Sequence, residues 1–423
     1  MNGHRRLREA IAWGPLVVIG LSWASFEVVG SGQENGNADD PVRVLVSRLD
    51  LERYKTTIKG LTNFGDRRQG TSRNREAVDW IQAELEAMGC ATERVFYTYD
   101  PAPRTGSRRG GGSRPPLNPS DGTQTGGRIG RNGSGPGGSS IFGYRRRTGV
   151  VRDPLAQPDE RLRALNSENP VAGDRSQVFC TTVGTTYPDE MYIVGAHMDG
   201  HGFGEAANDD GSGTAIVMEL ARIFNSPDVK TERSIRFALW NNEETGLNGS
   251  RAYVEQRRER QGLEDPVGSG RYPEPRWLGM IQHDMMLFDH GAPGPDGLVS
   301  RDQRREADVN IEFQSNSGLA GESRDLAFVF KEASDAYATD YPAMVGPHMT
   351  NTDSTPFMDI TPSISLRENE RGMHIGAGWD PHWHQPTDLY VTFTDDDFRL
   401  GLNAAQTSLA AIAQLVGAEI VIP

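Results

Sequence analysis

Acidic and imidazole side chains gather in one short stretch, residues 194–213, which reads VGAHMDGHGFGEAANDDGSG. It contains two histidines, three aspartates, one glutamate and six glycines, and it comes directly after a hydrophobic run. Imidazole nitrogen and carboxylate oxygen together are donors that zinc accepts. The stretch therefore indicates a metal site, and other parts of the chain must supply its remaining ligands.

Two further strand-like runs end in the same kinds of side chain. IRFALW is followed by Glu243 and Glu244, and WLGMIQ is followed by His283 and Asp284. In open α/β sheets, the binding crevice lies at the carboxyl ends of the strands. A single histidine or acidic pair is usually an ordinary surface or core feature, but the recurrence after three runs predicts one common site.

Asp199 follows His197 at a spacing that allows it to accept the second N–H of the imidazole. Such a bond fixes the tautomer of a metal-binding histidine and raises its basicity. We therefore expect Asp199 to support His197 within the catalytic site.

The surrounding elements alternate between strand and helix, which predicts a single α/β domain with a mainly parallel, mixed central sheet flanked by helices. Strands are expected at residues 94–99, 176–184, 190–196, 234–240, 276–282, 309–314 and 363–368. Helices are expected at residues 44–61, 72–88, 212–224, 248–257, 325–337 and 395–416.

The first 26 residues have the three-part composition of a signal peptide. The basic segment HRRLREA precedes an apolar core of 16 residues, and Ser22-Trp23-Ala24 forms a small-x-small cleavage pattern. The core is short for a membrane-spanning helix, and an uncleaved N-terminal anchor is the alternative. We expect an exported protein, periplasmic or extracellular, in which a flexible linker at residues 27–43 precedes a folded domain at 44–423.

Residues 101–150 interrupt this domain with a tract rich in Gly, Ser, Pro and Arg, which contains nine arginines and one acid, Asp121. Such a composition buries too little apolar area to offset the entropy of ordering, so a disordered insertion is expected. Contact with an anionic cell envelope is the alternative function of this insertion. The net charge of −14 for the whole chain argues against nucleic acid as a partner.

The two cysteines, Cys90 and Cys180, each lie beside an expected strand. Export permits disulfide formation, so one bridge and two buried free thiols are both open. Neither cysteine is accompanied by the histidine and aspartate pattern of a catalytic thiol.

The metal motifs resemble those of the di-zinc exopeptidases typified by bacterial secreted leucyl aminopeptidases, to which glutamate carboxypeptidases and glutaminyl cyclases are related. The resemblance covers residues 55–100 and 175–415 and implies a zinc-exopeptidase fold for the domain. It rests on VGAHMDGHG, AANDDGSGTAIVMELARIF, IRFALWNNEETGLNGSRAYV, LGMIQHDMM and HQPTD.

Carried over residue by residue, the resemblance makes Asp209 the carboxylate that bridges two zinc ions. It implies that His197 and Asp284 complete the first metal site and that Glu244 and His384 complete the second. Zinc is the expected metal, although other divalent ions suit a mixed nitrogen and oxygen site.

The resemblance also makes Glu243 the general base, which takes a proton from water and passes it to the leaving amine. It further implies a cis peptide bond between Asp209 and Asp210. We prefer His384 to His382 as a ligand because the family histidine precedes an acid by four positions, as His384 precedes Asp388.

Three other histidines, His201, His283 and His374, have no role in the family and are expected to be structural or surface residues. The predicted function is that of an exported aminopeptidase acting on peptides. A carboxypeptidase or dipeptidase is the alternative, but it needs cationic groups for the substrate carboxylate, and Arg367 is a single candidate. An inactive binding protein would lack ligands or the base, whereas this chain keeps all five ligand positions and Glu243.

Overall fold

The computed structural model describes residues 40–100, 150–288, 309–347, 352–368, 380 and 382–421, all within a compact unit that begins at Asp40. The expected signal peptide, the tract at 101–149 and His374 lie outside the described residues. The predicted linker boundary differs from the structure, because helix α1 (Pro41–Val46) already begins at Pro41. Asp40 caps this helix by accepting the N–H groups of Val42 and Arg43, and proline is favoured at a first helical position.

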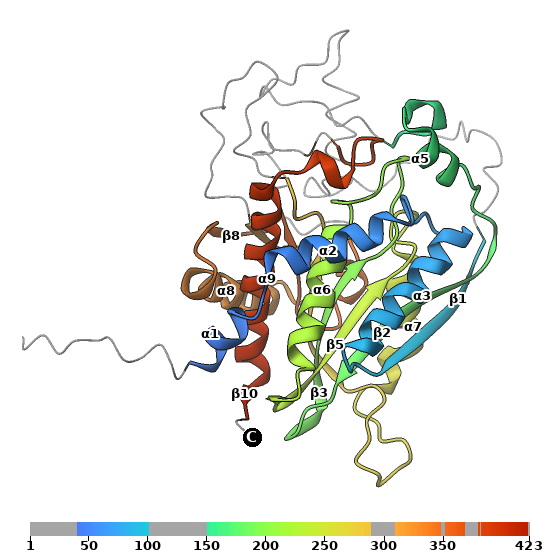
Figure 1. Cartoon of the computed structure of the whole chain (residues 1–423). Helices are drawn as coiled ribbons and strands as arrows, with labels where there is room; N and C mark the ends of the chain where they lie inside the picture. The colour runs from blue at the N-terminus through green and yellow to red at the C-terminus, as the bar shows by residue number, and fades with distance from the viewer. Residues whose placement is uncertain are drawn as a thin grey trace, which may run out of the picture. The chain divides into compact units, whose positions relative to one another are not determined.

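The described strands form an eight-stranded mixed sheet in the order β1-β2-β5-β3-β6-β9-β7-β8 (Figure 1). The pairs β5–β3, β3–β6, β6–β9 and β7–β8 are parallel, while β1–β2, β2–β5 and β7–β9 are antiparallel. The prediction of a single α/β domain around a mainly parallel mixed sheet is thus confirmed. The strands are β1 (Thr92–Tyr99), β2 (Gly173–Thr182), β3 (Tyr187–His197), β5 (Arg233–Trp240), β6 (Arg276–His283), β7 (Val309–Phe313), β8 (Ala343–Gly346) and β9 (Ser363–Arg367).

The helices follow the predicted pattern with local adjustments. The helix expected at 44–61 is divided, because the Asp50 carboxylate accepts the N–H of Arg53 and starts a new helix. A capping box of Thr394 and Asp397 starts α9, and Gly417 ends it with φ of 62°. The remaining bounds are α2 (Leu51–Thr62), α3 (Ser72–Ala87), α5 (Glu160–Leu165), α6 (Gly211–Phe224), α7 (Asn248–Arg257), α8 (Ala320–Tyr337) and α9 (Asp395–Val416).

Several short elements have no counterpart in the sequence prediction. Strands β4 (Val229–Thr231) and β10 (Ala418–Ile420) pair antiparallel in a separate two-stranded sheet. Strand β8 and helix α5 were also not expected. Elements of three to six residues contain too few side chains for a periodicity to be recognised. The short 3-10 helices are η1 (Pro154–Ala156), η2 (Arg258–Arg260), η4 (Thr355–Phe357) and η5 (Tyr390–Thr392).

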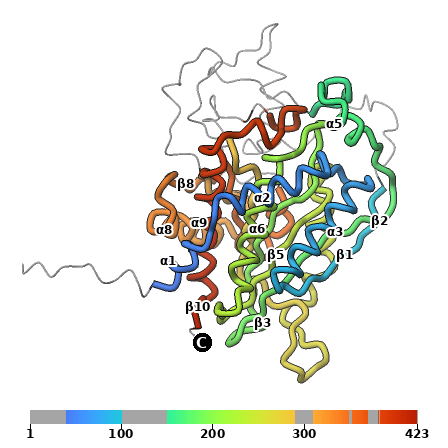
Figure 2. Tube along the Cα trace, in the orientation of Figure 1, coloured from blue at the N-terminus to red at the C-terminus, as the bar shows by residue number. Residues whose placement is uncertain are grey.

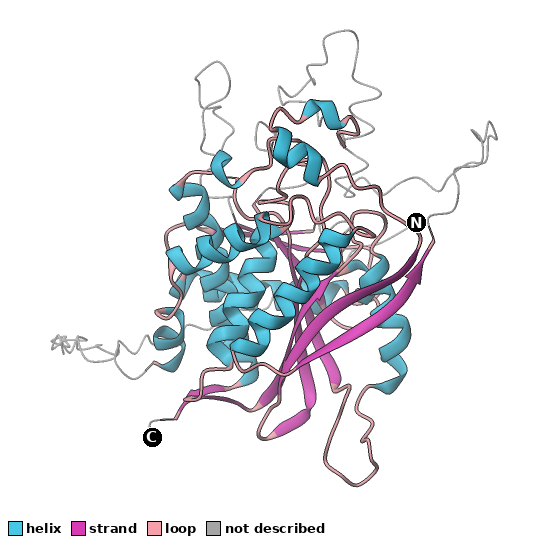
Figure 3. Cartoon of the chain, turned by 45° about the vertical axis from the view of Figure 1, so that its right-hand side comes forward, coloured by secondary structure: helices cyan, strands magenta, loops and turns pink. Residues whose placement is uncertain are grey.

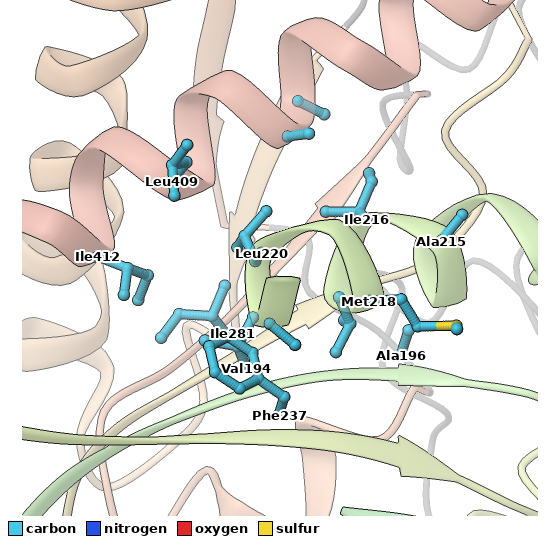
Figure 4. Packing of buried hydrophobic residues seen from close by; sticks show 14 of the residues in the cluster. Val194, Ala196, Ala215, Ile216, Met218, Leu220, Phe237, Ile281, Leu409 and Ile412 are labelled. Atoms are coloured by element: carbon cyan, nitrogen blue, oxygen red, sulfur yellow. The ribbon is translucent and has the colours of Figure 1, made fainter. Parts of the chain in front are cut away.

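One face of the sheet is covered by a layer of helices in which α6 lies between the strands and α9 (Figure 4). Val194 of β3 and Phe237 of β5 belong to the same buried cluster as Leu220 of α6 and Leu409 of α9. On this face the N-terminal helix α1 packs against the C-terminal helix α9, and α2 runs from α9 across α6 (Figure 2). Because α6 is buried almost all round, the loop that precedes it is held on a rigid support.

The opposite face of the sheet is covered by α7 and η4, so helices flank the sheet on both sides (Figure 3). Four aromatic residues form its centre: Trp240, Tyr253, Trp277 and Phe357. In five pairs of these rings the centroids lie 5.2–6.0 Å apart, within the range of favourable aromatic pairs.

A disulfide bond joins Cys90 to Cys180 and decides between the two alternatives left open by the sequence. It ties the turn after α3 to strand β2, and both residues are buried. Among the described residues, no helix has the length and apolar character needed to cross a membrane.

Candidate metal centre

The predicted ligands come together beyond the carboxyl ends of three neighbouring strands. His197 is the last residue of β3, Glu244 lies in the loop after β5, and Asp284 directly follows β6. Asp209 precedes α6, and His384 reaches the same place from a loop near the C-terminus. The strand-end argument from the sequence therefore describes the location of this cluster correctly.

The ligand atoms form two groups. His197, Asp209 and Asp284 make up the first group, and His201, Glu244 and His384 make up the second. Within each group, one ligand atom from each residue lies within 4.8 Å of the others.

The two oxygens of Asp209 point to different groups. Asp209 Oδ1 lies 3.3 Å from His197 Nε2, and Asp209 Oδ2 lies 2.9 Å from His384 Nε2. His197 Nε2 is 3.8 Å from Asp284 Oδ1, and His384 Nε2 is 2.9 Å from Glu244 Oε2. Two donors of one tetrahedral zinc ion lie about 3.4 Å apart when the bonds are about 2.1 Å long. The spacing thus fits a divalent ion in each group.

Buried polar atoms that make no hydrogen bond also favour bound ions here. Glu244 Oε1 and His201 Nε2 are both in this state. Because a buried polar atom normally has a partner, each such atom calls for an explanation. Both groups combine imidazole nitrogen with carboxylate oxygen, and this mixture of donors suits zinc.

The backbone around Asp209 is held by hydrogen bonds to the carboxylates of two other aspartates, Asp388 and Asp210. The peptide bond between Asp209 and Asp210 is cis, as the family resemblance implied. The Asp388 carboxylate accepts the N–H groups of Asn208 at 2.8 Å and of Asp209 at 3.1 Å. Asp210 caps α6 by accepting the N–H of Gly213 at 2.9 Å. Asp388 thus fixes the backbone of Asp209, a contact that the sequence did not reveal.

Asp199 contacts the His197 imidazole through its backbone carbonyl and not through its carboxylate. The group near His197 Nδ1, at 2.8 Å, is the backbone carbonyl of Asp199. Because a carbonyl only accepts, Nδ1 carries the proton and Nε2 presents its lone pair to the centre. The Asp199 carboxylate instead accepts the backbone N–H of Glu243 at 3.0 Å. Asp199 therefore links the imidazole of His197 to the loop that carries Glu243.

Glu243 and Glu244 leave the end of β5 through a sharp turn, because Asn242 has a left-handed backbone with φ of 66°. The Glu244 carboxylate points to the second group, as its contact with His384 shows. Burial raises the pKa of Glu243 well above its usual value, and the nearby Asp353 and Asp284 raise it further. A cation at the centre would oppose this rise and favour the ionised form.

Arg367 is buried in the interior of the protein and is paired there with Asp284. Its Nη2 donates to Asp284 Oδ2 at 2.5 Å, and the side chain is 1% exposed. Its Nε lies 3.9 Å from Glu312 Oε2. Burial by itself would raise the pKa of Asp284, but Arg367 and His197 hold that pKa well below its usual range.

His201, for which the sequence suggested a structural or surface role, lies within the second group of candidate ligands. Its Nε2 lies 3.1 Å from Glu244 Oε2, inside the second group. Burial lowers the pKa of His201 well below its usual value, and His384 lowers it further, which favours a neutral imidazole. Its position four residues after His197, within the same glycine-rich stretch, was the available signal.

Two further histidines of the described residues, His283 and His382, lie outside both groups. His283 is buried with Nε2 2.7 Å from Ser408 Oγ and Nδ1 3.3 Å from the Gly195 carbonyl, so it has a structural role. His382 Nδ1 lies 2.8 Å from Thr387 Oγ1 and belongs to neither group.

Comparison with known proteins decides the family, since residues 177–400 match the profile of peptidase family M28. The chain belongs to peptidase family M28. The matched segment includes every residue of both groups. A stretch of 228 residues is 50% identical to the probable lipoprotein aminopeptidase LpqL of Mycobacterium tuberculosis, covering 52% of this chain and 42% of LpqL. The chain thus spans less than half the length of the curated relatives that it matches.

Solved structures of similar fold include an aminopeptidase from Aneurinibacillus, with a TM-score of 0.55 and 18% identity over 90% of this chain and 97% of that one. A zinc aminopeptidase from Bacillus subtilis gives a TM-score of 0.56 and 16% identity over 87% and 95% of the two chains. At these identities the likeness shows a shared fold.

Proposed function

We propose that this M28 family member is a zinc-dependent aminopeptidase that binds two metal ions and removes N-terminal residues from peptides. The observation that carries the proposal is the position of Asp209, whose two carboxylate oxygens each approach a different group of ligands. The first group would hold one ion and the second group the other. Ions held by these residues would supply the Lewis acidity that lowers the pKa of water and polarises a scissile carbonyl.

Glu243 is the residue that would move the proton. It is half-buried beside the first group, and the Asp199 carboxylate fixes its backbone N–H. A carboxylate held in this way can accept a proton from the attacking water and deliver it to the leaving amine. Asp199 serves as a positioning residue for both His197 and Glu243.

The choice between amino- and carboxypeptidase depends on the cations available to a substrate. A carboxypeptidase must pair the carboxylate of its substrate, and Arg367 is already paired with Asp284 in the interior. This engagement favours the aminopeptidase. Arg68, which is half-buried within electrostatic range of Glu244 and His201, is the candidate cation for the carboxypeptidase or dipeptidase alternative.

Export of the protein is part of the proposal. Three observations support it: the signal-like N-terminus, the Cys90–Cys180 disulfide, which is typical of exported proteins, and the word lipoprotein in the name of LpqL. The arginine-rich tract at 101–150 would then be free to contact an anionic envelope.

The test is to measure zinc per chain together with the hydrolysis of a panel of aminoacyl-anilides, for wild type and Glu243→Gln. We expect two zinc ions per chain, turnover by wild type, and a loss of at least about 100-fold in kcat for Glu243→Gln with both metals retained. The matched control is Glu332→Gln, the same chemical change at an exposed position on α8, which should leave turnover unchanged.

Each other outcome points to a different conclusion. Two zinc ions without aminoacyl turnover would favour the carboxypeptidase or dipeptidase alternative. A folded wild type that binds no zinc would favour an inactive binding protein, and full activity in Glu243→Gln would remove Glu243 as the base.

A further inference from the structure

His201 has the geometry of an additional metal ligand. We propose that His201 is a protein ligand of the second metal ion, alongside Glu244, His384 and the bridging Asp209. This inference rests on the proposed metal centre, and it goes beyond the five ligand positions that the family resemblance implies.

The positions of the ring atoms carry the proposal. His201 Nε2 lies 3.1 Å from Glu244 Oε2, and His384 Nε2 lies 2.9 Å from the same oxygen. The two imidazole rings meet edge to face, with centroids 4.0 Å apart. The two nitrogen–oxygen distances, 3.1 and 2.9 Å, are close to the roughly 3.4 Å expected between donors of one tetrahedral zinc ion. Two imidazoles and one carboxylate therefore converge on one point.

The hydrogen bonding of His201 also separates it from a structural histidine. Its Nε2 is buried and makes no hydrogen bond among the described residues, in spite of its closeness to Glu244. The buried His283, by contrast, has both ring nitrogens in contact with oxygen atoms of the protein. A buried imidazole nitrogen without a hydrogen bond, aimed at two other donors, is what a metal ligand requires.

The backbone brings the two imidazoles together through a glycine contact. A Cβ at Gly202 would lie 2.4 Å from the backbone carbon of His384, and Gly202 has φ of 106°. Only glycine allows the loop carrying His201 to approach the loop carrying His384 so closely. The close approach of these loops is thus a built feature of the site.

A ligand role for His201 makes the two metal sites unequal. The first group has one imidazole and two carboxylates, one of which, Asp284, shares its charge with Arg367. The second group would have two imidazoles, Glu244 and a share of Asp209. Because nitrogen-rich sets favour zinc over manganese and magnesium, the second site should bind zinc first and more tightly.

The experiment is a zinc titration of the metal-depleted full-length protein in competition with a chromophoric chelator. Wild type is expected to show two steps. His201→Ala should weaken the tighter step by at least about tenfold, the lower limit seen when even an outer-shell partner of a metal ligand is removed. The matched control is His382→Ala, which removes an imidazole from the His384 loop but outside both groups.

Cobalt provides a readout that does not depend on activity. The visible absorption of the first Co²⁺ equivalent should change in His201→Ala and stay as in wild type in His382→Ala. His201→Gln, which keeps most of the side-chain volume, is measured in parallel, so that a folding defect of the alanine variant does not decide the result. Far-ultraviolet circular dichroism of the metal-free proteins confirms that each variant is folded.

Unchanged zinc affinities and an unchanged cobalt spectrum in folded His201→Ala and His201→Gln would overturn the proposal and leave His201 a packing residue. If wild type itself binds no zinc, the proposed function fails together with this inference. If wild type binds two zinc ions and hydrolyses aminoacyl-anilides while both His201 variants keep both affinities, this inference alone fails.

Discussion

Replacing Arg367 by methionine should affect the metal-free protein more than the metal-loaded protein. Arg367 Nη2 donates to Asp284 Oδ2 at 2.5 Å, and the two side chains are 1% and 5% exposed. Removing one partner of such a buried pair costs about 3–5 kcal/mol of unfolding free energy. Two unit charges about 4 Å apart at an effective dielectric constant of about 20 attract by about 4 kcal/mol, which agrees with that range.

Metal binding should reduce this loss. In the variant, a divalent ion bound by Asp284 would supply the positive charge that Arg367 provides in wild type. The ion would also bind without repulsion from the Arg367 guanidinium. We expect the loss in the metal-loaded protein to be smaller by at least about 1 kcal/mol, which corresponds to roughly fivefold tighter metal binding by Arg367→Met.

The assay is urea unfolding of both proteins with and without zinc, together with a zinc titration of the metal-depleted forms. The matched control is Arg236→Met. Arg236 Nη1 donates to Glu274 Oε2 at 2.5 Å, and this pair is similarly buried, at 2% and 1% exposure, but neither residue belongs to a group of candidate ligands. Its loss should destabilise the metal-free and metal-loaded proteins by the same amount.

Two results would refute this reasoning. An Arg367→Met variant that loses less than about 1 kcal/mol without metal would mean that the buried pair contributes little. Equal losses with and without zinc, as in the Arg236→Met control, would mean that Asp284 does not share its charge with a metal ion.

Three further predictions concern other parts of the chain. Replacing Cys90 and Cys180 by alanine opens a loop with a sequence separation of 90 and should lower the unfolding free energy in urea by about 4–5 kcal/mol without changing anilide turnover of the folded enzyme; an equal stability would contradict this. Burial lowers the pKa of His283 to about 4, below its unfolded value of about 6.5. As the pH falls from 7.5 to 5 the unfolded state therefore takes up a proton that the folded state does not, so metal-free wild type should lose about 2 kcal/mol more stability than His283→Asn, and parallel pH profiles would count against it. Arg68→Ala should change kcat/KM equally for a dipeptide and for its C-terminal amide, whereas a selective loss on the dipeptide would favour the carboxypeptidase or dipeptidase alternative.

The sequence predicted those parts of the fold that depend on local patterns. The bounds of α7 and α9 match the prediction, and α9 is fixed by its own capping box and by Gly417. Strands β3, β5 and β6 each contain a mostly apolar run near the carboxyl end, so these ends could be placed within a few residues. Because His197, Glu244 and Asp284 follow those ends, their meeting at one edge of the sheet could be expected from the sequence.

The tertiary structure decided the contacts between loops that are distant in the chain. The sequence offered no local pattern to show that the Asp388 carboxylate would accept the backbone N–H of Asp209. It also did not show that Arg367 would pair with Asp284. Likewise, the family resemblance gives His201 no role. His201 meets His384 only because the loop that contains Gly202 packs closely against the backbone of His384. The physical reason is that periodicity and capping act over a few neighbouring residues, whereas the partner of a buried polar group depends on which loops pack together once the sheet has formed.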